Sequence, residues 1–259
     1  MSGGTVSTTG LIRRVDECMG TVFSFAVRDE CGAAAVQDAI GWLHWVDRTF
    51  STYRGDSAIS RLNSGALFLA DCPLEVGEVL AACAEVSRVS GGYFAASVNG
   101  ALDPSGLVKG WAIERASDLL RAAGVADHAI GGGGDVQLRG ESSPGQPWQI
   151  GIAHPARSGE LLAVVEGRDL AVATSGTAER GAHVVNPLTG RPATDLLSIT
   201  LVGERLGEID AYATAALAMG AGAREWVEQL PGIEALGVTS DGSVWETSGF
   251  ADHARRQAP

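Results

Sequence analysis

The spacing of apolar residues changes along the chain near Gly124, and this change limits the possible folds more than any other feature. Before it, apolar side chains recur every three or four residues, as in amphipathic helices, over residues 32–50, 71–90 and 107–123. After it, short segments alternate apolar and polar residues as strands do, interrupted by one Ala-rich helical stretch at 209–219 that ends at Gly220.

The order of these segments predicts the fold class. Runs of strands and runs of helices without regular βαβ alternation favour an α+β fold over a doubly wound parallel sheet. We expect a single domain over residues 11–250, with a largely antiparallel or mixed sheet flanked by helices, and flexible termini at 1–10 and 251–259. Residues 11–27 predict a strand pair that turns near Met19, and residues 51–63 predict a polar, turn-like connection.

The charge of the chain argues against polyanionic partners. Its 19 Lys and Arg residues stand against 31 Asp and Glu residues, which gives a formal net charge of −12. Nucleic acid and anionic membranes are therefore repelled on average, and an anionic ligand needs a local site.

Two sequence patterns bear on the cellular location. It shows no apolar stretch of about 18 residues and no signal-peptide pattern, which predicts a cytoplasmic protein without a membrane span. The irregularly spaced cysteines form no CxxC pair, which favours buried thiols in a reducing compartment over a disulfide framework or a zinc cage; they are Cys18, Cys31, Cys72 and Cys83.

The segment DPSGLVKG, residues 103–110, places Lys109 between glycines at the start of a predicted helix. The unpaired N–H groups and positive dipole end of a helix, together with a lysine, favour a phosphate site, and glycines let a ligand approach the backbone. The alternative is an ordinary helix start with Ser105 as the N-cap and a solvated lysine.

A second glycine-rich segment, AIGGGGDVQLRG at 129–140, leads into a predicted strand. It lacks the Gly-Lys-Ser/Thr of a P-loop, and a strand follows where a dinucleotide fingerprint requires a helix. Either a flexible turn or the close approach of a planar or phosphate ligand explains the four glycines.

Two further motifs carry groups suited to catalysis. His183 precedes the turn signals of NPLTG at 186–190 and is interpreted either as a general base or as a half-buried ring; the residue pattern alone favours the ring. Asp210 and Thr214 are four residues apart, on one face of the predicted helix, where their oxygens suit Mg²⁺. The alternative is a dipole-favoured acid in the first turn and a surface threonine.

Taken in chain order, the motifs resemble those of the ApbE family, whose members are FAD:protein FMN transferases. The likeness covers most of residues 11–220, and its most specific elements are HxxxPxTG and DxxxT. It is carried by MGT at 19–21, STYRGDSAISRLN at 51–63, GGYF at 91–94, the D…G..KG of 103–110, GGGGD at 131–135, ATSG at 173–176, HVVNPLTG at 183–190 and DAYAT at 210–214.

The resemblance implies a fold, a reaction and a set of site residues. FAD would bind with its pyrophosphate bridged by Mg²⁺, and FMN would pass to a Thr or Ser hydroxyl of an acceptor protein with release of AMP. Lys109, Asp210 and His183 are the expected catalytic residues, and His183 is the best candidate for the base, because an imidazole can accept a proton at physiological pH. It assigns the metal to the Gly106 carbonyl, Asp210, the Ala213 carbonyl and Thr214, and FAD contacts to Met19, Tyr53, Tyr93, Phe94, Ala95, Asp103, Lys109 and His183.

The chain departs from the family pattern at two positions. Ala95 and Asn186 stand where the family usually has an aspartate, so each departure removes a carboxylate from the expected site. Two alternatives to the transferase follow: an FAD pyrophosphatase that yields FMN and AMP, and a non-catalytic FAD-binding protein. Family members usually act outside the cytoplasm behind a signal or lipid anchor, and here an intracellular acceptor is expected.

Overall fold

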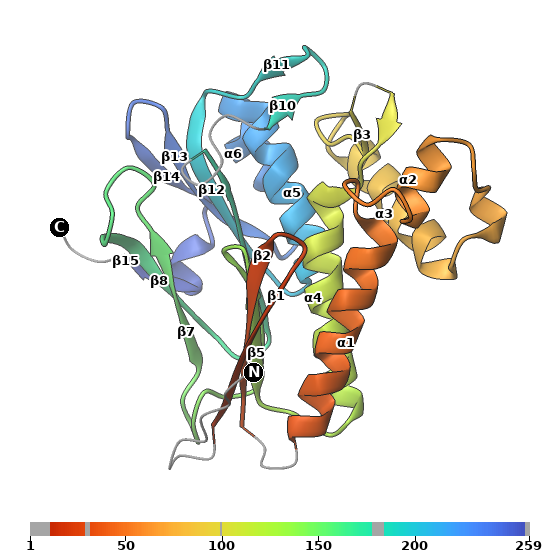
Figure 1. Cartoon of the computed structure of the whole chain (residues 1–259). Helices are drawn as coiled ribbons and strands as arrows, with labels where there is room; N and C mark the ends of the chain where they lie inside the picture. The colour runs from red at the N-terminus through yellow and green to blue at the C-terminus, as the bar shows by residue number, and fades with distance from the viewer. Residues whose placement is uncertain (1–10, 29–31, 99, 178–183, 257–259) are drawn as a thin grey trace.

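The protein has three layers in a computed structural model that describes residues 11–28, 32–98, 100–177 and 184–256 (Figure 1). Helices α1 (Gly32–Phe50), α4 (Ser105–Ala122) and α5 (Leu206–Met219) cover one face of an eight-stranded sheet. A three-stranded sheet covers the other face. One hydrophobic cluster fills the space between helices and large sheet, and a second lies between the two sheets.

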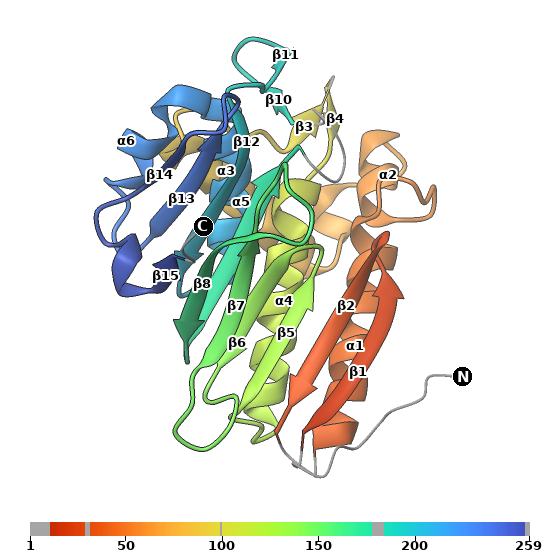
Figure 2. The same ribbon diagram turned by 90° about the vertical axis from the view of Figure 1, so that its left-hand side faces the viewer.

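The large sheet is antiparallel at each of its strand pairs, and Figure 2 shows its strands side by side. This arrangement confirms the predicted single-domain α+β fold. In spatial order the strands are β1 (Ile12–Cys18), β2 (Thr21–Val27), β5 (His128–Gly132), β6 (Asp135–Arg139), β9 (Leu170–Gly176), β12 (Leu196–Gly203), β13 (Glu234–Thr239) and β14 (Val244–Glu246).

The small sheet corrects the prediction of a flexible terminus from residue 251, as far as residue 256. Its strands are, in order, β15 (Ala254–Arg256), β8 (Leu161–Gly167) and β7 (Trp148–Ala153). Residues 250–252 form a short 3-10 turn, η3 (Phe250–Asp252), whose Phe250 is buried in the cluster between the sheets. An apolar anchor at 250 therefore holds the chain against β8, a contact that local polarity does not reveal.

The remaining elements are short, apart from α3 (Leu74–Val89). They are α2 (Ala58–Asn63), α6 (Ala223–Val227), η1 (Leu69–Asp71), η2 (Gly220–Gly222), the ribbon of β3 (Ser97–Val98) and β4 (Ala101–Leu102), and the ribbon of β10 (Val185–Asn186) and β11 (Arg191–Pro192). Among the described residues, no helix is both long and apolar enough to cross a membrane.

Helix α2 lies in a segment that we expected to be turn-like. Ser57 caps it, because the Ser57 hydroxyl accepts a hydrogen bond from the Ser60 N–H at 3.0 Å. Ile59 is fully buried and anchors the helix to the core. A serine cap and one buried apolar residue are enough for this short helix, although its sequence is otherwise polar.

Helices α4 and α5 pack at unusually short range. A Cβ atom added at Gly110 would lie 2.6 Å from Asp210 Cβ and 2.7 Å from the Leu206 carbonyl oxygen. Glu114 of α4 also caps the start of α5, since its carboxylate accepts from the Gly207 N–H at 2.9 Å and from Arg205 Nε at 3.0 Å. The glycine therefore sets the spacing of the two helices.

We expect Gly110→Ala to destabilise the protein by about 1–3 kcal/mol, the usual cost of forcing an extra methyl group into a packed contact. The matched control is Gly41→Ala on α1, where an added Cβ would meet nothing within 4 Å. There the better helix propensity of alanine should stabilise by roughly 1 kcal/mol. Urea unfolding of both variants measures the difference, and equal stabilities would contradict the close contact.

Candidate active site

Lys109, the only lysine of the chain, lies between two carboxylates from different elements. Its Nζ is 3.0 Å from Oδ2 of Asp210 on α5 and forms an ion pair with Oδ2 of Asp135, the first residue of β6. The side chains of Asp135 and Asp210 are only 1% and 8% exposed, and that of Lys109 is 22% exposed. With one positive and two negative charges, this acid–lysine cluster carries a formal charge of −1.

Backbone donors hold both acids in place. Asp210 Oδ2 accepts a hydrogen bond from the Gly110 N–H at 2.9 Å, and Asp135 Oδ1 accepts one from the Thr174 N–H at 2.9 Å. Asp210 can approach this N–H because residue 110 has no side chain. The acids are therefore fixed by main-chain groups as well as by Lys109, which gives the cluster a rigid geometry.

Thr214 extends the cluster by one turn of α5. It lies on the same helix face as Asp210, and its hydroxyl oxygen is 3.4 Å from the Ser175 hydroxyl oxygen of β9. A Cβ atom at Gly106 would lie 3.6 Å from Thr214 Cγ2, so the first turn of α4 meets this part of α5. Residues 106, 109, 210 and 214, which the sequence analysis singled out, thus lie along one helix–helix contact. Ala213, a predicted metal ligand through its carbonyl, is fully buried on α5.

The four-glycine run has two structural uses. Gly132 lies in β5, where an added Cβ would be 2.7 Å from the ring of Phe23. Gly133 and Gly134 form the turn to β6 with φ values of 58° and 89°, which favour glycine. A Cβ at Gly133 would lie 3.4 Å from Lys109 Cδ. The close approach that the run permits therefore includes the stem of Lys109.

The turn between β1 and β2 reaches the same region. The added Cβ at Gly133 would also lie 3.4 Å from Thr21 Oγ1, at the first residue of β2. Met19 in this turn has a φ of 49° and is the only non-glycine residue with positive φ among those described. Such a conformation costs energy in a residue with a side chain, and strain of this kind often lies at functional sites.

The predicted FAD contacts in the loops before α4 occupy different environments. Phe94 is 2% exposed, and a Cβ at Gly106 would lie 3.1 Å from its ring. Asp103 Oδ1 accepts a hydrogen bond from the Ser105 N–H at 3.1 Å, and Ser105 is the first residue of α4 and not its N-cap, which corrects the alternative interpretation of this segment. Tyr93 packs partly buried against the main core, whereas Ala95 is exposed. Phe94 is thus the predicted FAD contact of this loop that lies nearest the helix contact.

Two further predicted FAD contacts are Tyr53 and His183. Tyr53 is 99% exposed, and no contact with the cluster is described for it. His183 lies outside the described residues, so its role stays a prediction. The loop that follows it reaches the GGYF segment, since a Cβ at Gly92 would be 3.1 Å from Leu188 Cδ2.

Asn186, one of the two departures from the family pattern, has a clear local role. Its Oδ1 accepts a hydrogen bond from the Leu188 N–H at 2.9 Å, and its carbonyl accepts from the Gly190 N–H at 2.8 Å. An aspartate oxygen makes the same kind of Asx turn. The substitution therefore preserves the turn while it removes a charge.

Asp135 is the site residue that sequence reasoning missed. The GGGGD motif drew attention to its glycines, and no role was given to the acid that ends it. An aspartate is unfavourable in a strand, and its position directly after a glycine turn was the available signal. Its partner lies on a distant helix, which the sequence alone does not indicate.

The fold and this cluster define a class: an α+β protein in which two helices and a strand bring a lysine, two buried acids and a hydroxyl to one place. The chain belongs to the ApbE family, whose model matches residues 19–101 and 97–237. The assignment to the family therefore rests on most of the chain and not on isolated motifs.

The individual relatives agree with this membership. An FAD:protein FMN transferase from Vibrio cholerae is 30% identical over 129 residues, which cover 46% of this chain and 39% of that protein. One from Rhodobacter capsulatus is 28% identical over 217 residues, which cover 80% of this chain and 38% of that protein. The chain thus matches less than half of the length of each. A solved flavin transferase ApbE from Vibrio cholerae has the same fold, with a TM-score of 0.82 at 20% identity over 94% of this chain and 99% of that one.

Proposed function

We propose that this protein is a Mg²⁺-dependent FAD:protein FMN transferase, which moves FMN from FAD to a Thr or Ser hydroxyl of an acceptor protein and releases AMP. The observation that carries the proposal is the meeting of Lys109, Asp210 and Thr214 along one helix contact in a chain of the ApbE family. Lys109 lies 101 positions before Asp210 in the sequence, and phosphoryl transfer needs such groups close together.

The residues present fit a magnesium ion. Asp210 and Thr214 offer oxygen atoms on one helix face, and the net charge of −1 in the acid–lysine cluster favours a cation. In a regular helix the Gly110 N–H would donate to the Gly106 carbonyl. Here this N–H donates to the Asp210 carboxylate, so the Gly106 carbonyl is more available to a cation. Asp210, Thr214 and the carbonyls of Gly106 and Ala213 would hold the ion. Once bound, Mg²⁺ neutralises charge on the diphosphate.

The reaction needs one bond made and one broken. The acceptor hydroxyl oxygen forms a bond to the FMN phosphorus of FAD, the bond from that phosphorus to the bridging oxygen breaks, and AMP leaves with the bridging oxygen. Lys109 supplies a positive charge beside the diphosphate, while Asp135 holds its ammonium group in position. His183 takes the proton of the hydroxyl.

We expect His183→Ala to slow FMN transfer about 100-fold, the lower range for losing a general base, because the hydroxyl must then lose its proton to water. FAD affinity should change little if the ring acts mainly on the proton. Transfer assays quenched at set times measure the rate, and FAD titration measures the affinity. The control is His154→Gln on a surface loop. A transfer rate equal to that of the unaltered protein would remove His183 as the base.

One assay separates the proposed activity from its alternatives. The protein is incubated with FAD, Mg²⁺ and an acceptor domain that contains a flavinylation motif, and both AMP and covalent flavin on a denaturing gel are measured. A transferase gives flavin fluorescence on the acceptor and AMP in equal amount. AMP without acceptor labelling indicates an FAD pyrophosphatase, and neither product with tight FAD binding indicates a binding protein; both outcomes contradict the proposal.

A cytoplasmic location, and with it an intracellular acceptor, is part of the proposal. The cysteine pattern of the sequence supports it, because four irregularly spaced cysteines without a CxxC pair are typical of a chain without a disulfide framework.

A further inference from the structure

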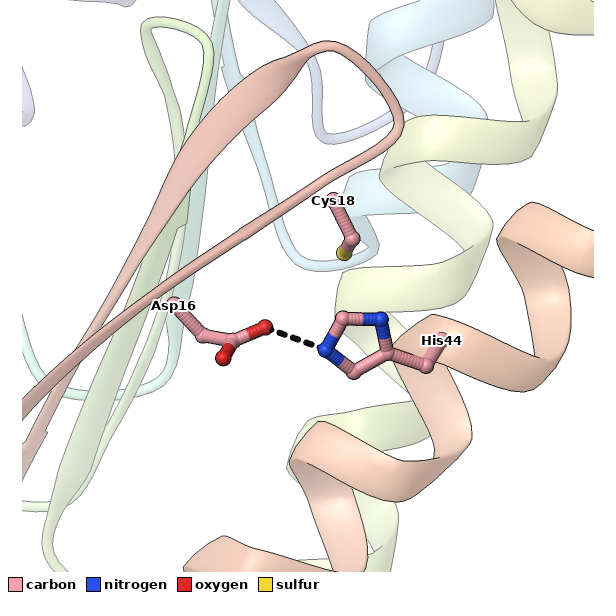
Figure 3. Close-up of side chains that lie close together, drawn as sticks. All are labelled: Asp16, Cys18 and His44. Carbon is pink, nitrogen blue, oxygen red and sulfur yellow. Dashed lines mark ion pairs between the residues drawn. The ribbon is translucent and has the colours of Figure 1, made fainter. Parts of the chain in front are cut away.

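A second group of ligand-type side chains lies between β1 and α1. Asp16 and Cys18 are two residues apart on β1, so both face α1, and His44 faces them from the helix (Figure 3). Asp16 Oδ2 is 2.7 Å from His44 Nε2, and one ligand atom of each residue lies within 4.8 Å of those of the other two. Three donor atoms from two elements thus surround one point.

We propose that Asp16, Cys18 and His44 form a binding site for a divalent transition metal, with zinc the best match and a water molecule as the fourth ligand. A thiolate, an imidazole and a carboxylate are the donors that zinc accepts in a tetrahedral arrangement, whereas Mg²⁺ and Ca²⁺ avoid sulfur. The site is therefore chemically different from the oxygen site of Asp210 and Thr214.

The burial of the three residues suits a site that is reached from solvent on one side. Cys18 is buried and forms the inner wall, while the side chains of Asp16 and His44 are 27% and 39% exposed. A metal can enter through the exposed side and keep its water there. The two donor atoms at 2.7 Å must move to about 3.3 Å, as tetrahedral bonds of about 2.0 Å require, and a half-exposed imidazole can make this shift.

Two further observations favour a cation at this group. Asp16 Oδ2 is buried, and the partner described for it is His44 Nε2, a group that is itself a common metal ligand. Buried carboxylate oxygens normally have hydrogen-bond donors or cations as partners. Asp47, one turn from His44 on α1, adds a second negative charge near the Cys18 thiol. The two acids therefore favour a cation beside the thiol.

The proposed metal would join the edge strand of the large sheet to α1. β1 is the first strand in the sheet order, so only one of its long edges is paired with a neighbouring strand. Cys18 is also the residue directly before the strained Met19 turn. A bond from Cys18 and Asp16 to His44 would fix both the strand and the turn against the helix.

Cobalt titration of the full chain tests the proposal, because Co²⁺ replaces zinc and reports its ligands by absorption. We expect one equivalent to give a thiolate-to-cobalt charge-transfer band and the intense visible bands of a tetrahedral site. Both should be lost in Cys18→Ser and weakened in His44→Gln, and both should persist in the matched controls Cys72→Ser and His154→Gln. Absence of the charge-transfer band in the unaltered protein, or its persistence in Cys18→Ser, would overturn the proposal.

Thermal unfolding keeps the test valid if a variant folds poorly. Zinc at about a hundredfold excess over its Kd should raise the folded-to-unfolded ratio about a hundredfold in the unaltered protein and in Cys72→Ser. In Cys18→Ser the midpoint should not respond to zinc, and its value without metal shows whether the variant is folded. An equal zinc response in Cys18→Ser would contradict the site.

Discussion

Lys109→Met is expected to destabilise the protein by about 3–5 kcal/mol, the usual cost of leaving buried charges without their partner. The ammonium group contacts Asp135 and Asp210, whose side chains are 1% and 8% exposed, so its removal leaves two buried carboxylates close together. Methionine retains most of the volume of the lysine stem that packs against Gly133. The loss should therefore come from charge and not from a cavity. Urea unfolding at neutral pH measures it.

The double variant Lys109→Met/Asp135→Asn is the control for this interpretation. It removes one of the two buried charges, so it should regain a substantial part of the stability lost in Lys109→Met, and Asp210 can keep its hydrogen bond from the Gly110 N–H. If the double variant is less stable than Lys109→Met, repulsion between Asp135 and Asp210 does not explain the loss of stability in Lys109→Met. The acid–lysine cluster would then lack the electrostatic role given to it here.

Asp210→Asn is expected to reduce FMN transfer by about 100- to 1,000-fold, the range for losing one group that stabilises developing charge. Asparagine keeps the size of the side chain and an oxygen that can accept from the Gly110 N–H, so the helix contact should survive. Alanine at this position would also remove that hydrogen bond, so a lower transfer rate could then come from lost stability as well as from the lost carboxylate. The comparison of transfer rates at several Mg²⁺ concentrations measures the effect.

The matched control is Glu208→Gln, which makes the same charge change on the same helix. Glu208 is exposed in the first turn of α5 and accepts from the Tyr212 hydroxyl at 3.3 Å. It should retain transfer, whereas Asp210→Asn should need more Mg²⁺ to recover part of its rate. Equal rates in both variants would show that Asp210 neither holds the metal nor shapes the site.

The helices and most strands were predictable because their burial follows the local period of the sequence. Val36, Leu43 and Val46 of α1 and Val76 and Val79 of α3 lie at helical spacing and are all buried. The strand pair of residues 11–27 and the stop of α5 at Gly220 follow from equally local signals. Where periodicity was absent, prediction failed, as it did for α2 and β15.

The site was predictable only in part, because its contacts are not local. Family motifs pointed to Lys109, Asp210 and Thr214, and the i, i+4 rule placed the last two on one face. No spacing rule connects Asp135 to Lys109, and none connects Cys18 to His44. The cysteine pattern even argued against a zinc cage, since a site with one cysteine leaves no repeated spacing in the sequence.

The central claim is that Asp210 and Thr214, beside Lys109, hold a metal ion at the diphosphate of FAD. Crystals of the protein with FAD and Mn²⁺, a magnesium substitute with measurable anomalous scattering, test it most directly. We predict an anomalous peak within bonding distance of the Asp210 carboxylate and the Thr214 hydroxyl, with the FAD diphosphate next to Lys109. A bound FAD whose diphosphate lies elsewhere, or a metal peak away from α5, would contradict the account.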